Sequence, residues 1–204
     1  MPCGFRLQAE VSRLHTMTLL LLLALAFSQT SSPVRVVMET EAGEIEMEID
    51  ATRAPITAGN FLKYVDAGLY DGGRFHRTVT LKPDNQPDNT TKIEVIQAAA
   101  NAARRQEFLP PIPLERTSAT GIRHLDGALS MARSGPDSAR DGFFICVGDQ
   151  PSLDYGGTRN ADGQGFAAFG RVVRGMDVVR KIHAARAEGQ TLAPSIRILR
   201  VARR

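Results

Sequence analysis

Residues 34–50 read "VRVVMETEAGEIEMEID", and the alternation of this stretch decides the fold class. Six small or apolar side chains alternate on one side of two extended segments: Val36, Met38, Thr40, Ile45, Met47 and Ile49. The turn "EAGE" separates the segments, and the glutamates at 44, 46 and 48 occupy the other side. Because successive side chains of a strand point to opposite faces, the stretch predicts a β-hairpin with one buried face and one wet face.

The segment that follows the hairpin has helical spacing instead. Its apolar positions recur three and four residues apart, at Phe61, Leu62, Val65 and Leu69. Pro55 suits the first helical position, and Gly68 suits the end of a helix. We therefore predict that a helix follows the first two strands.

The remainder of the chain is rich in short strand candidates. They are separated by clusters of Gly, Pro, Asn and Asp and lie at 74–79, 93–99, 127–133, 142–148, 166–173 and 195–202. A second helix is predicted within 175–189, where Met176, Val179 and Ile182 share a face. Many strands with only two helices predict a mainly β domain, an antiparallel barrel or a sandwich. A closed barrel, with the two ends of the domain paired, removes the exposed edges.

Composition is that of an ordinary globular protein. The chain has 204 residues, 43% of them hydrophobic and 23% charged, with a formal net charge of +3. The arginines are scattered and do not form a run or alternate with aromatic residues. This distribution argues against a nucleic-acid partner.

The first residues have the pattern of a secretory signal peptide. Arg6 and Arg13 precede the apolar run "MTLLLLLALAF" (17–27), and small residues follow it. We expect a signal peptide over 1–28 and a linker over 29–33, and hence a periplasmic or secreted protein. An uncleaved membrane anchor is the alternative, and a start at Met17 would weaken the signal. After residue 28 the lone cysteine is Cys146, which is expected to be a buried strand thiol.

The stretch "GGRFHRTVT" (72–80) places an arginine in a predicted strand. In a regular strand Phe75, Arg77 and Val79 share one face, with His76 and Thr78 on the other. Either the guanidinium lies at a strand end in water, or the protein holds a fixed cation beside an apolar surface.

Several segments, in order along the chain, resemble the cyclophilins. They include "FHR", "VIQ", "LSMA" followed by "GP", "FFI" and "FGRVVRGMDVV", and the resemblance covers a domain at 34–202. It implies a closed eight-stranded antiparallel barrel capped by two α-helices, and peptidyl-prolyl cis/trans isomerase activity without metal or cofactor. Proline-containing polypeptides would be the partners, and we expect a monomer.

The resemblance also assigns site residues. The arginine of "FHR", Arg77, is the implied catalytic residue, because it would donate a hydrogen bond to the prolyl nitrogen of the twisted amide. His76 is expected to be structural, since the reaction removes no proton. The implied substrate-binding residues are Gln97, Phe144, Leu153, Val95, Ala132, Arg133 and Phe166.

Departures from the family pattern gather at this site. Six residues differ from those expected in the family: Glu94 replaces a phenylalanine, Val95 a methionine, Arg133 an asparagine, Gly142 a glutamine, Ser152 a tryptophan and Phe166 a histidine. If Glu94 pairs with the arginine, its charge weakens the pull on the prolyl nitrogen. An inserted loop near 80–91, "LKPDNQPDNTT", is expected beside the groove.

These observations support two functions of different classes. The first is an isomerase that assists the folding of exported proteins. The alternative is a chaperone or adaptor that binds proline-containing peptides with weak or no turnover, which the missing tryptophan and Glu94 favour. A barrel that binds an unrelated apolar ligand ranks last, because it makes the ordered motifs accidental.

Overall fold

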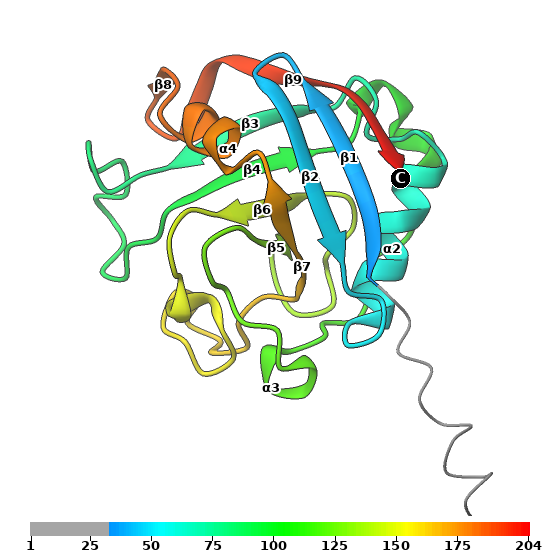
Figure 1. The fold of residues 1–204 in the computed structure, drawn as a ribbon. Helices are drawn as coiled ribbons and strands as arrows, with labels where there is room; N and C mark the ends of the chain where they lie inside the picture. Colours follow the sequence, from blue (N-terminus) through cyan, green and yellow to red (C-terminus); the bar gives the residue numbers. More distant parts are fainter. Residues whose placement is uncertain (1–32) are drawn as a thin grey trace, which may run out of the picture. The chain divides into compact units, whose positions relative to one another are not determined.

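The hairpin predicted from residues 34–50 forms the first two strands of a β-barrel (Figure 1). Strands β1 (Val34–Thr40) and β2 (Gly43–Ile49) pair antiparallel along their whole length. The computed structural model describes residues 33–204. The predicted signal peptide (1–28), and the linker (29–33) up to residue 32, therefore lie outside the described residues.

Further strands complete the barrel. They are β3 (Arg74–Val79), β4 (Val95–Ala99), β5 (Ala128–Met131), β6 (Phe143–Cys146), β7 (Ala168–Arg174), β8 (Ala187–Glu188) and β9 (Thr191–Arg203). Their order is β1-β2-β7-β5-β6-β4-β3-β9, and β9 pairs again with β1. Eight antiparallel strands thus close on themselves, while the two-residue β8 pairs with β9. The predicted closed barrel is confirmed, and so is the pairing of the first strand with the last.

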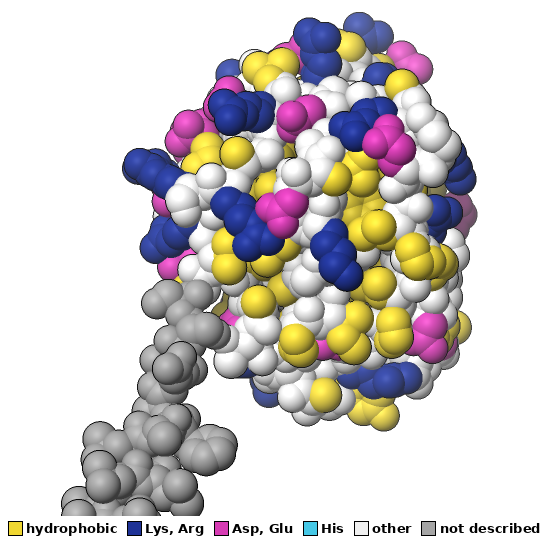
Figure 2. All heavy atoms as spheres, turned by 90° about the vertical axis from the view of Figure 1, so that its right-hand side faces the viewer, with side chains coloured by type: hydrophobic (Ala, Val, Ile, Leu, Met, Phe, Trp, Pro, Cys, Tyr) yellow, Lys and Arg dark blue, Asp and Glu magenta, His cyan; other side chains and the backbone are white. Residues whose placement is uncertain are grey.

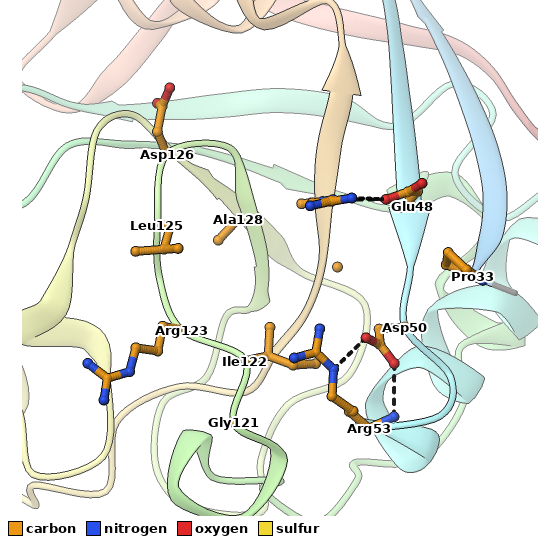
Figure 3. Close-up of a pocket in the computed structure, with 12 residues that line it drawn as sticks. Pro33, Glu48, Asp50, Arg53, Gly121, Ile122, Arg123, Leu125, Asp126 and Ala128 are labelled. Carbon is orange, nitrogen blue, oxygen red and sulfur yellow. Dashed lines mark hydrogen bonds and ion pairs between the residues drawn. The ribbon is translucent and has the colours of Figure 1, made fainter. Parts of the chain in front are cut away.

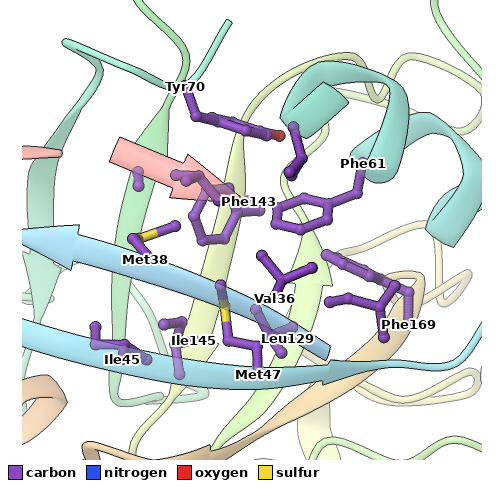
Figure 4. Packing of buried hydrophobic residues seen from close by; sticks show 14 of the residues in the cluster. Val36, Met38, Ile45, Met47, Phe61, Tyr70, Leu129, Phe143, Ile145 and Phe169 are labelled. Carbon is purple, nitrogen blue, oxygen red and sulfur yellow. The ribbon is translucent and has the colours of Figure 1, made fainter. Parts of the chain in front are cut away.

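The interior is filled by one large apolar cluster (Figure 4). All six side chains that define the hairpin's buried face are at most 6% exposed. Phe61 packs edge-on against Phe143, with 5.5 Å between ring centroids, and lies 5.1 Å from the ring of Phe169. The helix that follows the hairpin therefore supplies an aromatic side chain to the core.

Two helices pack against the barrel on opposite sides in the view of Figure 1. Helix α2 (Pro55–Asp66) begins with the predicted proline, and the carboxylate of Glu115 accepts hydrogen bonds from the first free amides, those of Ile56 and Thr57. The chain leaves the helix through Gly68, whose φ of 61° favours glycine. Helix α4 (Met176–His183) buries Val179 and Ile182, as its predicted face requires.

Short helical turns occupy the connections. They are η1 (Ala102–Glu107), α3 (Thr117–Thr120) and η2 (Pro151–Leu153). No helix within residues 33–204 has both the length and the apolar character needed to cross a bilayer.

Ion pairs cover the outer face of the hairpin. Glu46 pairs with Arg35, Arg174 and Arg204, and Glu48 pairs with Arg35 and Arg171. The glutamates face outward as predicted, but Glu46 is only 8% exposed because the arginines lie over it. On the face turned toward the viewer in Figure 2, acidic and basic side chains likewise lie next to one another.

Strand β3 corrects one prediction. A β-bulge interrupts its pairing with both neighbours between Phe75 and Arg77. The extra residue shifts the alternation by one position. Phe75 therefore packs in the barrel interior, whereas Val79 belongs to a second apolar cluster on the opposite face of the wall. The prediction that Phe75, Arg77 and Val79 share a face is wrong, and the bulge is the reason.

Candidate active site

The second apolar cluster forms the floor of a groove of about 320 Å³. The groove lies on the outer face of the barrel wall formed by β3, β4, β6 and β5. Side chains on the inner face of the same strands fill the core. All eight residues assigned from the sequence line it: Arg77, Gln97, Phe144, Leu153, Val95, Ala132, Arg133 and Phe166. The structure thus brings together residues that are spread over about half of the chain.

Arg77 is held in the groove by two amide oxygens. Its Nη1 donates to Oε1 of Gln97 at 2.9 Å, and its Nε and Nη2 both donate to Oε1 of Gln190, at 2.8 and 2.5 Å. Burial in this site lowers the pKa of Arg77 from its usual value. Arginine nevertheless remains protonated near neutral pH, so the groove holds a fixed cation.

Sequence reasoning missed Gln190. This residue lies in the tight turn between β8 and β9, a position that carries no local motif. Its amide nitrogen donates to the main-chain oxygen of Asn85, and the side chain of Asn85 donates to the carbonyls of Thr78 and Gly189. The inserted loop therefore positions Gln190, which in turn positions the guanidinium of Arg77.

The aromatic wall of the groove is built from Phe144 and Phe166. Their rings meet edge to face, with 5.3 Å between centroids and an interplanar angle of 89°. The guanidinium carbon of Arg133 lies 5.0 Å from the centroid of the Phe166 ring, and its two terminal nitrogens bind the carboxylate of Asp162 at 2.8 and 2.9 Å. This side chain is 1% exposed, so it belongs to the wall of the groove.

A buried hydrogen-bonded row supports Phe144 from behind. The His124 ring stacks on Phe144 at 6.0 Å, its Nδ1 lies 2.7 Å from Asp154 and its Nε2 lies 2.9 Å from Ser130. Burial alone would raise the pKa of Asp154, but the hydrogen bonds and charge of His124 lower it. Although serine, histidine and aspartate meet here, the Ser130 side chain is fully buried, so no substrate reaches it.

A third arginine lines the groove and was also missed. Arg159 belongs to the loop between η2 and β7, and its Nη1 donates to Oε1 of Gln86 at 2.9 Å and to the carbonyl of Thr91 at 2.7 Å. Both acceptors belong to the segment around the insertion. Gln86 is fully buried and also bonds the main chain of Thr80 and Ile93. No periodicity or spacing in the sequence marks this contact.

The substituted position Glu94 does not neutralise the site. Glu94 is not among the residues that line the groove, and it forms no ion pair within residues 33–204. The partners of Arg77 are the neutral side chains of Gln97 and Gln190. The argument that this glutamate weakens the cation is therefore not supported by the structure.

A larger cavity, of about 560 Å³, lies elsewhere on the barrel (Figure 3). Four of its charged side chains form two ion pairs: Arg171 pairs with Glu48 at 2.7 Å, and Arg53 pairs with Asp50 at 2.7 Å. None of the eight residues assigned from the sequence lines it. The smaller groove, which holds the partly buried cation of Arg77, is therefore the better candidate for chemistry.

Comparisons with known proteins agree with this geometry. The family model described as "Cyclophilin type peptidyl-prolyl cis-trans isomerase/CLD" matches residues 35–203. "Peptidyl-prolyl cis-trans isomerase A" of Dickeya dadantii (strain 3937) is 37% identical over 164 residues, which cover 80% of this chain and 77% of the relative. "Peptidyl-prolyl cis-trans isomerase B" of Escherichia coli (strain K12) is 32% identical and covers 72% of this chain and 82% of its own.

Solved structures show the same fold. A cyclophilin type peptidyl-prolyl cis-trans isomerase of Cryptosporidium parvum, crystallised in the presence of the dipeptide Ala-Pro, superimposes with a TM-score of 0.64. The match covers 83% of this chain and 98% of that chain at 18% sequence identity. At this level of identity the likeness concerns the barrel architecture.

Proposed function

The chain belongs to the cyclophilin-type peptidyl-prolyl cis-trans isomerases, and on this premise we propose that Arg77 is its catalytic residue and that the groove around it holds the X-Pro segment. The observation that carries the proposal is a single one. A partly buried guanidinium, held by two neutral amide oxygens, faces the apolar cluster that contains Phe144 and Leu153.

The reaction is rotation about an amide bond. The barrier is about 18–20 kcal/mol because the C–N bond has partial double-bond character. No covalent bond to the enzyme is needed. The catalyst has to bind the twisted amide more strongly than either planar form, as every catalyst binds its transition state more strongly than its substrate.

Arg77 supplies that difference through the prolyl nitrogen. In the twisted amide the nitrogen lone pair has left conjugation and accepts a hydrogen bond, whereas in the planar amide it does not. A charge-assisted hydrogen bond is worth roughly 1.5–3 kcal/mol, which corresponds on the order of ten- to a hundredfold in rate. Apolar surroundings and fixation of the substrate supply the rest.

Gln97 and Gln190 act as positioning residues for the guanidinium. Because they accept from both sides of the arginine fork, the group keeps one orientation before the substrate binds. Their oxygens carry no net charge, so they do not cancel the charge of Arg77. A carboxylate in the same place would form an ion pair and reduce the pull on the prolyl nitrogen.

The proline ring needs an apolar seat, and the groove offers one. Val95, Phe144 and Leu153 are at most 5% exposed and belong to the same cluster, and Phe166 packs against it. Phe166 adds aromatic surface in a groove where Ser152 stands in the tryptophan position. The main chain of Ala132 and Arg133 provides the edge along which the peptide would lie.

Exchange NMR on a blocked X-Pro peptide tests this assignment. We expect the parent to accelerate cis/trans exchange and Arg77→Ala to lose at least about tenfold of kcat/KM. Peptide affinity and thermal stability should change little, because the arginine acts in the transition state. Equal losses of rate, affinity and stability would show that Arg77 is a structural residue.

We further propose that the enzyme acts on exported chains, as a monomer. The support for export is the N-terminal apolar run at 17–27 and the presence of a single cysteine, Cys146, after residue 28. Expression of the full chain, followed by fractionation and mass determination of the mature N-terminus, tests it. A product that keeps residue 1 and remains in the cytoplasm contradicts the export proposal but leaves the assignment of Arg77 intact.

A further inference from the structure

The groove contains more positive charge than the isomerisation itself requires. Three arginines line it, Arg77, Arg133 and Arg159, and none of its lining residues is acidic. Arg133 is neutralised by the two oxygens of Asp162. Arg77 and Arg159 have no carboxylate partner within the described residues 33–204. Two uncompensated cations therefore face the space where a peptide binds.

Arg159 is placed to bind a ligand of its own. Its Nη1 is occupied by Gln86 and by the carbonyl of Thr91, whereas no acceptor in the described part of the chain takes up its Nε or Nη2. These donors lie in the planar fork that binds a carboxylate through two parallel hydrogen bonds. Because Nη1 is anchored on the insertion segment, the remaining donors are fixed before any ligand arrives.

The two cations also affect each other. Burial lowers the pKa of Arg159, and the positive charge of Arg77 lowers it further. Like charges in a partly desolvated groove repel, and an anion that enters the groove relieves this repulsion. A carboxylate on the substrate is therefore favoured twice, by the donors of Arg159 and by the field of both arginines.

We propose that this groove prefers X-Pro segments that carry an acidic side chain next to the proline, and that Arg159 is the residue that binds its carboxylate. This inference rests on the proposed function, since Arg77 is kept for the prolyl nitrogen. Arg159 adds affinity for substrate and transition state alike. The preference should therefore appear in KM more than in kcat.

Matched peptides with both termini blocked test the proposal by exchange NMR. One pair has Glu or Gln before the proline, and a second pair has Glu or Gln after it. For the parent we expect kcat/KM for Glu to exceed that for Gln by roughly fivefold in one of the two pairs, the size of a charge-assisted contact at a partly exposed site. The difference should shrink when the salt concentration is raised to about 0.5 M.

Variants assign the preference to one residue. Arg159→Gln should remove the difference in kcat/KM between the Glu and Gln peptides, whatever the change in their common rate. Arg159→Lys, which keeps the charge but not the fork, should retain part of the preference. The matched control is Arg105→Gln, which removes the same charge from an exposed arginine of η1 outside the groove and should keep the full preference.

The outcomes separate this inference from the function on which it rests. If the parent isomerises Glu and Gln peptides equally in both pairs, the acidic preference is overturned and the isomerase assignment stands. If the preference survives in a folded Arg159→Gln protein, as judged by its melting temperature, Arg159 is the wrong residue. If the parent accelerates no peptide, the proposed function fails and the inference fails with it.

Discussion

Two outer faces of the same barrel treat their arginines in opposite ways. On the hairpin face, Arg35, Arg171 and Arg174 each bind a carboxylate of Glu46 or Glu48, at 2.5–2.8 Å. On the groove face, Arg77 and Arg159 bind amide and carbonyl oxygens instead. Both faces are built on strands of one sheet, so the difference lies in the side chains and not in the architecture.

The positive charges on the hairpin face are neutralised by carboxylates, whereas those of Arg77 and Arg159 are not. An arginine paired with a carboxylate has little net field beyond the pair, and such pairs cover the apolar stems and backbone beneath them. An arginine held by neutral oxygens is equally well oriented but keeps its full charge. The groove thus combines fixed geometry with an uncancelled cation, which is the combination that electrostatic catalysis needs.

The largest effect on kcat is expected when the side chain of Arg77 changes shape but keeps its positive charge. Arg77→Lys keeps the cation, but one ammonium group cannot serve Gln97, Gln190 and the prolyl nitrogen with the geometry of the fork. We expect roughly a tenfold loss of kcat at constant salt. Exchange NMR measures it, and a rate within a factor of about two of the parent would mean that charge alone is sufficient.

The next effect comes from giving the groove a carboxylate like those of the hairpin. Gln190→Glu places an anion where Nε and Nη2 of Arg77 now meet a neutral oxygen. We expect kcat to fall by roughly fivefold, because a salt bridge competes with the prolyl nitrogen for the guanidinium. Gln190→Ala is the matched control, since it removes the support without adding charge. An equal or faster rate for Gln190→Glu than for Gln190→Ala would contradict the role given to neutral partners.

The converse change removes the central carboxylate of the hairpin face. Glu46→Gln leaves Arg35, Arg174 and Arg204 without their shared partner. Since the arginines are 43–62% exposed, we expect a loss of stability of only about 1 kcal/mol, or a melting temperature lower by about 2–4 °C. Isomerisation should not change, and a change in kcat/KM would show that the two faces communicate.

The smallest effect concerns pH. Burial lowers the pKa of His76 from its usual value of 6.5, and the charge of Arg77 acts in the same direction. Below pH 6.5 the unfolded chain therefore binds a proton that the folded chain does not, so stability should fall slightly as the solution becomes more acidic. His76→Asn should weaken this dependence in thermal melts. Between pH 7 and 9 kcat should be flat, because His76 is neutral and Arg77 charged throughout; a histidine-like titration there would point to a general base.

Sequence patterns predict the barrel well because its interior obeys simple alternation. The buried face of the hairpin, the face of α4 and the strand segments all follow from periods of 2 and 3.6 residues, and the closed architecture follows from the need to pair edges. Alternation fails where the strand register shifts, and the shift that matters for the site is at His76, where a bulge is inserted without a glycine or proline to mark it. Because of that one residue, Phe75 lies in the core whereas Val79 lies in the second apolar cluster.

The site is predictable where its residues belong to motifs that the chain shares with the cyclophilins. Motif resemblance led to Arg77, Gln97 and Phe144, and the structure places them in one groove. Gln190 and Arg159 could not be found in this way, because both lie on loops and their partners lie about 70 to 113 residues away. Loop contacts of this kind depend on how loops meet above a finished sheet, which local sequence does not encode.

The pairing of β1 with β9 has a practical consequence for protein engineering. Val36 lies opposite Arg203, so the two ends of the barrel are adjacent strands on the side of the hairpin, while the groove is lined from other strands and loops. A short linker could join these ends in a circular permutant, with new termini opened in a connection away from the groove, such as that around η1. Opening the chain at 81–91 instead would release Asn85 and with it the support of Gln190. The barrel should therefore tolerate new termini in the connection around η1 but lose isomerase activity when the chain is opened at 81–91.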